Sequence, residues 1–186
     1  MAARKSLANF KGHWSVAALV LLMLHMGTSA LAADAATPVK IAVFSFELED
    51  KSAGAGIIAQ DERDTKYLTE ATDEAKRLLA ASGDYTIIDA TGADLGSARQ
   101  YGLRNCGGCE AKIARKLGAE QAMLGVVTRV NRTEFTLLMR ISDAATGKAV
   151  SQGFTDLRMG ANYAWPRGVK WLMDKKASMN KKKSPG

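Results

Sequence analysis

The first 32 residues determine which part of the chain can form a folded core. A short basic segment precedes an apolar run from Trp14 to Met26, and Ala30 and Ala32 follow at the small-residue spacing that signal peptidase requires. This run of about 13 residues is shorter than the ~20 that a membrane-spanning helix needs. The pattern predicts a secretory signal peptide, residues 1–32, cleaved after Ala32. An uncleaved membrane anchor is the alternative.

The remaining residues, 33–186, suffice for one domain with a hydrophobic core. Alternating apolar patterns favour strands, and apolar residues three or four apart favour helices. The expected strands are 39–46, 85–89, 122–130, 135–141 and 148–157, and the expected helices are 61–82, 109–117 and 162–173. Asp61, with Asp64 three residues on, is the expected N-cap of the first helix. The stretch 47–60 is expected to be a loop.

The order of these segments is β-α-β-α-β-β-β-α. It predicts an α/β (α+β) fold, in which a single mixed β-sheet has helices packed on it. The domain is expected to span residues 33–173.

The net charge of +7 is concentrated at the two ends of the chain. The predicted signal peptide and the segment 174–186 carry it, and residues 33–173 are neutral. The basic end is expected to be a disordered, solvated tail. Weak attraction to anionic lipid or polymer is the alternative. Nucleic acid is not an expected partner of a secreted chain.

Both histidines, His13 and His25, lie in the predicted signal peptide. The processed chain would therefore lack an imidazole base, a histidine metal ligand and a histidine-activated nucleophile. We expect no cofactor and no metal, and an enzymatic activity is not favoured.

The only two cysteines, Cys106 and Cys109, lie at the start of the second expected helix. In a secreted chain this spacing favours a disulfide. The alternative is a thiol–disulfide redox site, because a helix N-terminus stabilises a thiolate. Haem attachment would require histidine at position 110, where the chain has Glu110.

Acidic residues gather on both sides of the loop that contains Gly54 and Gly56. A calcium ion would suit carboxylates, but their spacing matches no calcium loop, and nothing in the sequence brings two of them together for hydrolysis. Solvated charges and helix-start acids are favoured, and a ligand pocket between the sheet and this loop is a further hypothesis. The glycines lack the Lys-Ser/Thr of a phosphate loop. The acids are Glu47, Glu49, Asp50, Asp61, Glu62 and Asp64.

The last expected helix carries Trp165, Arg167 and Trp171. One interpretation is a helix that packs its tryptophans on the sheet. The other is a partner-binding surface, in which Arg167 faces an acid or an aromatic ring.

Several motifs resemble the periplasmic domain shared by the curli-secretion lipoprotein and the TolB N-terminal domain. The resemblance covers about residues 39–155 and implies a fold but no activity. It rests on the strands 39–46 and 85–89, on Ala114–Glu120 before the strand near Gly125, and on Ile141-Ser142-Asp143 to Gly147.

The whole chain after the signal peptide also resembles a bacterial family of predicted secreted proteins of unknown function. Its marks are Phe46–Asp50 with Ser52, Cys106 and Cys109 before Ile113-Ala114 and Leu117-Gly118-Ala119, Asp156-Leu157-Arg158, Trp165–Gly168, and Trp171-Leu172. Asn162-Tyr163-Ala164 departs from the more acidic stretch that the resemblance implies there.

Together these patterns favour a secreted or periplasmic, non-enzymatic domain that binds an envelope protein or a cell-wall component. The redox use of Cys106 and Cys109 is the alternative. The sequence does not indicate an oligomeric state.

Overall fold

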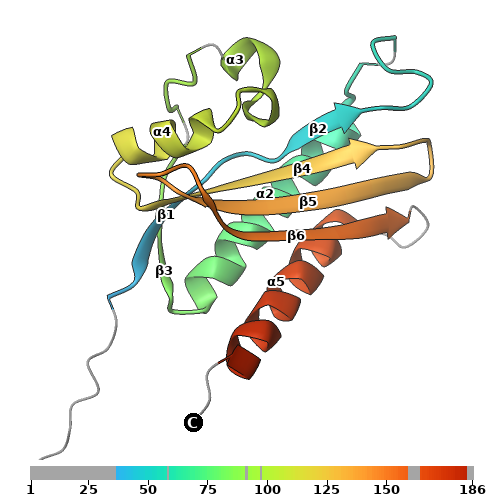
Figure 1. Ribbon diagram of the computed structural model, residues 1–186. Coiled ribbons are helices and arrows are strands. Elements are labelled where there is room, and N and C mark those ends of the chain that lie inside the picture. The colour runs from blue at the N-terminus through green and yellow to red at the C-terminus, as the bar shows by residue number, and fades with distance from the viewer. Residues whose placement is uncertain (1–36, 58, 91, 97, 159–163, 184–186) are drawn as a thin grey trace, which may run out of the picture. The chain divides into compact units, whose positions relative to one another are not determined.

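A mixed six-stranded β-sheet lies at the centre of the computed structural model (Figure 1). The strand order is β3-β1-β4-β5-β6, and β2 pairs with β4 beyond the end of β1. The pairs β1–β3, β1–β4 and β2–β4 are parallel, whereas β4, β5 and β6 form an antiparallel meander. The strands are β1 (Val39–Val43), β2 (Glu47–Asp50), β3 (Tyr85–Ile88), β4 (Gln121–Arg129), β5 (Glu134–Asp143) and β6 (Ala149–Arg158).

The structure describes residues 37–57, 59–90, 92–96, 98–158 and 164–183. The predicted signal peptide and the departure at Asn162-Tyr163 lie outside these residues. Within the described residues, no helix is both long enough and apolar enough to cross a bilayer.

Helices cover both faces of the sheet (Figure 1). One face carries α2 (Glu62–Ala81) and α5 (Ala164–Lys183), which enclose a core that includes Leu79, Met123 and Val169. The other face carries α3 (Ala98–Tyr101), η2 (Leu103–Asn105) and α4 (Cys109–Lys116) over a smaller core of Ala42, Phe44, Leu103, Ala114 and Leu124. The expected fold class and order of strands and helices are therefore confirmed, with β2, α3 and η2 as additional short elements.

The start of α2 is the expected one. The Asp61 carboxylate accepts a hydrogen bond from the Asp64 N–H at 2.8 Å, and the Asp64 carboxylate accepts one from the Asp61 N–H at 3.2 Å. This reciprocal capping box satisfies two of the N–H groups that a helix start leaves unpaired.

The expectation of a loop over 47–60 is wrong for Glu47–Asp50, which form β2. Val43 pairs with Met123, and Glu47 pairs with Val126. The chain therefore advances four residues from β1 to β2 while β4 advances three, which is the irregularity of a β-bulge. The extra residue lets Phe44 and Phe46 enter opposite cores.

The expected end of the last helix at Met173 is also wrong, because α5 continues to Lys183. The residues from Asp174 to Lys183 include no proline or glycine, and lysine, alanine and methionine favour helix. The boundaries assigned to the signal peptide, the domain and the basic tail remain predictions.

Candidate functional site

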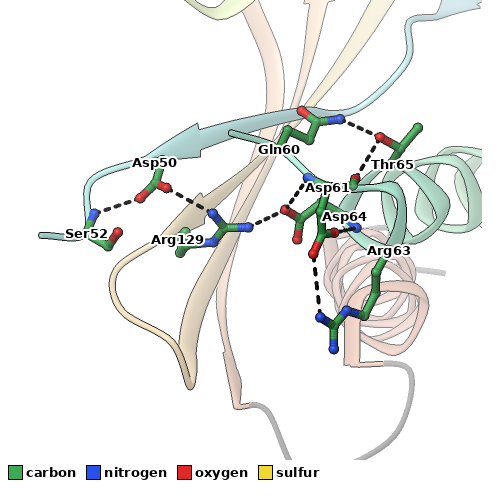
Figure 2. A network of polar contacts seen from close by, with 8 residues as sticks. All are labelled: Asp50, Ser52, Gln60, Asp61, Arg63, Asp64, Thr65 and Arg129. Carbon is green, nitrogen blue, oxygen red and sulfur yellow. Dashed lines mark hydrogen bonds and ion pairs between the residues drawn. The ribbon is translucent and has the colours of Figure 1, made fainter. Parts of the chain in front are cut away.

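Arg129, the last residue of β4, makes two ion pairs at one end of the sheet (Figure 2). Its Nη1 lies 2.9 Å from the Asp50 carboxylate at the end of β2, and its Nη2 pairs with the Asp64 carboxylate in the first turn of α2. All three side chains are largely buried. Arg129 thus joins the end of β4 to β2 and α2, although Asp50 and Asp64 lie 79 and 65 residues earlier in the sequence.

Hydrogen bonds hold both carboxylates in place around Arg129 (Figure 2). The Ser52 N–H donates to Asp50 at 2.9 Å, and Asp64 accepts from the Asp61 N–H as part of the capping box. Hydrogen bonds from Ser52, together with Arg129, lower the pKa of Asp50 below its usual value, against the opposing effect of burial. The hydrogen bond from the Asp64 N–H and the nearby Arg63 lower the pKa of Asp61. Asp50 and Asp61 are therefore ionised at neutral pH.

A cavity of about 380 Å³ lies beside this network. One wall is aromatic: the Trp165 ring centroid lies 5.6 Å from that of Tyr67 and 5.5 Å from that of Phe135. The Arg129 guanidinium lies 5.8 Å from the Phe135 ring centroid. The cavity is lined by Ser52, Ala59, Asp61, Arg63, Asp64, Tyr67, Arg129, Arg132, Phe135 and Trp165.

The cations of this cavity differ in how they are neutralised. Arg129 has two carboxylate partners, and Arg63 pairs with Asp61 at 3.5 Å. Arg132 is exposed in the turn between β4 and β5, and within the described residues it forms no ion pair. Arg132 is therefore the cation that is available to an anionic group beside the aromatic wall.

The structure divides the predicted acidic cluster. Asp50 and Asp64 bind Arg129, while Glu49 pairs with Lys51 at 3.2 Å. Glu47 lies on the other face of the sheet, where it accepts hydrogen bonds from the Leu103 and Arg104 N–H groups at 2.6 and 3.0 Å. The interpretation of these acids as solvated charges and helix-start residues is wrong for Glu47 and Asp50, which are partly buried and paired, and it fits Glu62, which is exposed.

Cys106 and Cys109 are joined by a disulfide at the start of α4. The next residue, Glu110, is 1% exposed, and its Oε1 accepts from Arg140 at 2.6 Å. Within the described residues, this is the one group of three cysteine, histidine or acidic side chains close enough to share a metal ion. Because the two sulfur atoms are bonded to each other, they are not free thiolates.

The three residues predicted to bind a partner do not share one surface. Trp165 is 3% exposed and belongs to the core and to the cavity wall, whereas Trp171 is 49% exposed. Arg167 is exposed. Trp165 is thus the packed tryptophan of the first interpretation, and Trp171 remains accessible to a partner.

Sequence reasoning missed Tyr67, Arg129, Arg132 and Phe135 as site residues. Tyr67 lies in the expected helix 61–82 and Phe135 in the expected strand 135–141, and neither position marks a site by itself. The sequence offers one signal for this site, which is the pair Arg129 and Arg132 at the end of a buried strand. Two arginines at this spacing match no known binding motif. The hypothesis of a pocket between the sheet and the loop after Asp50 agrees with the observed cavity, which Ser52 and Ala59 line.

A model of the family described as "Protein of unknown function (DUF2380)" matches residues 39–177. No curated protein matches the sequence.

Solved structures with a similar arrangement have low sequence identity to the chain. The C-terminal domain of LpoB from Salmonella enterica is 20% identical, with a TM-score of 0.45, over 76% of this chain and 94% of that one. Lipoprotein GNA1162 from Neisseria meningitidis is 16% identical, with a TM-score of 0.47, over 76% and 96%. TolB from Acinetobacter baumannii is 10% identical, with a TM-score of 0.41, over 75% and 29%. Likenesses at this level carry no information on function.

Arg129→Met should destabilise the fold strongly, because it leaves the carboxylates of Asp50 and Asp64 without their cation. Breaking a buried ion pair costs roughly 3 kcal/mol. Urea unfolding followed by circular dichroism measures the loss. Arg77→Met is the matched control, because it removes an exposed pair with Glu74 and should cost about 0–1 kcal/mol. Equal losses in the two variants would contradict the role given to Arg129.

Acid should weaken the fold through Asp50. A carboxyl whose pKa is lowered by folding stabilises the native state above its unfolded pKa, and this contribution is lost as the pH falls through the folded pKa. The usual pKa of an aspartate is about 4, and folding lowers the pKa of Asp50, so the free energy of unfolding should fall from about pH 4 downward. Urea titrations at several pH values should show a smaller fall for Asp50→Asn, and an unchanged fall would refute the assignment.

Cys106→Ser/Cys109→Ser should lower the free energy of unfolding by about 2 kcal/mol, the chain-entropy value for so short a loop. Urea unfolding of the variant and of the oxidised parent measures this. If the bond is only a stabilising link, the oxidised parent should not accelerate the oxidation of a small dithiol, whose thiolate would have to attack the Cys106–Cys109 bond. Catalysed exchange that the double variant loses would favour the redox alternative.

Proposed function

The chain belongs to the family described as "Protein of unknown function (DUF2380)", and we propose that it is a secreted, non-enzymatic domain that binds a component of the cell envelope. The expected membership of a family of unknown function is confirmed. Since that family lends no activity, the proposal depends on the cavity beside Arg129.

The cavity combines an apolar wall with an available cation. Ligand pockets typically have volumes of 300–1,000 Å³ and place a few polar groups against an apolar lining. A cavity of about 380 Å³ is at the small end of that range, so it suits one or two residues of a larger partner. The aromatic wall and Arg132 together favour a group that carries a carboxylate next to an apolar or aromatic side chain. Chain ends of envelope proteins and peptides of the cell wall have this chemistry.

The cavity is better suited to binding than to proton transfer. A general acid or base works best when its pKa is near the working pH, whereas the pKa values of Asp50 and Asp61 are lowered. The two arginines nearest these acids are paired with them. Both histidines of the sequence lie before the predicted cleavage site.

The predicted signal peptide is the support for a periplasmic or secreted location.

N-acetyl-phenylalanine is the probe for this proposal, because it joins an aromatic ring to a carboxylate. Its addition to the labelled protein should shift the NMR signals of the Arg132, Phe135 and Trp165 amides. N-acetyl-phenylalaninamide, which lacks the carboxylate, should bind at least about tenfold more weakly, as expected for the loss of a charged hydrogen bond.

Arg132→Gln should reduce the affinity for N-acetyl-phenylalanine to that of the amide. Arg115→Gln is the matched control: it removes an exposed arginine on α4, on the other side of the sheet, and should leave binding unchanged. Equal binding of acid and amide, or equal affinities of the two variants, would refute the proposed site.

A further inference from the structure

A second surface lies along α5, beyond the cavity beside Arg129. Trp171 of α5 is 49% exposed, and the Nζ of Lys175 lies 4.8 Å from its ring centroid. Lys175 also lines a groove between α5 and the sheet. An exposed tryptophan and a lysine are therefore accessible side by side next to this groove.

The groove next to these residues is apolar and has a volume of about 250 Å³. Its walls come from the sheet and from α5, which are the elements that enclose the larger core. Three methionines line the groove, and their flexible thioether side chains adapt to irregular apolar ligands. The apolar side chains come from Met123, Met139, Ile141, Leu172 and Met173.

Positive charge follows directly along the chain. The segment Lys175–Lys183 contains five lysines and no acidic residue, and α5 extends to its end. The preceding acid, Asp174, is already paired with Lys170 at 2.8 Å. Because residues 33–173 are neutral, this end of α5 is a localised positive region.

We propose that the C-terminal half of α5, with the adjoining groove, binds the surface of an anionic phospholipid bilayer. Interfacial helices combine tryptophan with a lysine-rich polar part. Lysines near an anionic leaflet are attracted to its surface potential. Trp171 enters the headgroup region, and the groove accepts the end of an acyl chain.

The exposed Trp171 and the groove suit an apolar partner, and the lysines suit a negative one. An anionic bilayer supplies both, which favours it over an acidic protein. Binding to a bilayer goes beyond the proposed function and uses residues that do not line the cavity beside Arg129. An experiment that refutes one of the two proposals therefore does not refute the other.

Vesicle co-sedimentation tests the inference with the protein released in soluble form from the periplasm. Vesicles of phosphatidylglycerol and phosphatidylcholine should bind the protein, and binding should weaken as salt is added. Vesicles of phosphatidylcholine alone should bind it much less. Equal binding to both vesicle types would overturn the inference.

Matched charge variants show whether α5 is responsible. Lys175→Gln/Lys176→Gln should lower the partition coefficient roughly 25-fold, which is about fivefold for each lysine. Lys112→Gln/Lys116→Gln removes the same charge from exposed positions on α4 and should have little effect. Equal losses in the two double variants would show a net-charge effect and would overturn the inference.

Fluorescence shows whether Trp171 meets the lipid. Anionic vesicles should shift the tryptophan emission to shorter wavelength, and Trp171→Phe should abolish the shift, because Trp165 is already buried. An unchanged emission on binding would contradict insertion. Binding to heparin but not to vesicles would assign the lysines to an acidic polymer and overturn the inference.

Discussion

The interaction on which the site depends is the pairing of one guanidinium with two carboxylates. Burying Arg129 is unfavourable unless its charge is compensated and its donors are satisfied. Asp50 and Asp64 meet both requirements, and hydrogen bonds from Ser52 and Asp61 hold them in position. The pairing therefore attaches the end of β2 and the start of α2 to the end of β4. The cavity exists where these three ends meet.

The strands and helices that bury regular apolar patterns could be predicted from the sequence, whereas β2 could not. Glu47–Asp50 contains three acids in four residues, a composition that is depleted in strands. Pairing with β4 and the compensation of Asp50 by Arg129 override that preference. Arg129 is 79 residues from Asp50 and 65 from Asp64, and no local pattern encodes contacts at such separations. The sequence therefore predicted the layers but not the ion pairs that build the site.

The two tryptophans of α5 show how helical geometry limits a prediction from spacing. Six residues correspond to about 600° of rotation, so Trp165 and Trp171 point roughly 120° apart. A single partner surface containing both is hard to build on one helix. The structure accordingly places Trp165 between Tyr67 and Phe135 in the core and leaves Trp171 half exposed beside Lys175.

The two proposed surfaces are connected by α5, and this connection has a geometric consequence. Trp165 lines the cavity near the start of the helix, and Trp171 lies about 9 Å farther along its axis, at 1.5 Å per residue. When the axis of α5 is tilted so that Trp171 and the lysine-rich end meet the headgroups first, the start of the helix lies farther from the lipid. Arg132, in the turn beyond β4, lines the same cavity as Trp165. A domain bound in this way would present its cavity to envelope components above the headgroups rather than to the lipid itself.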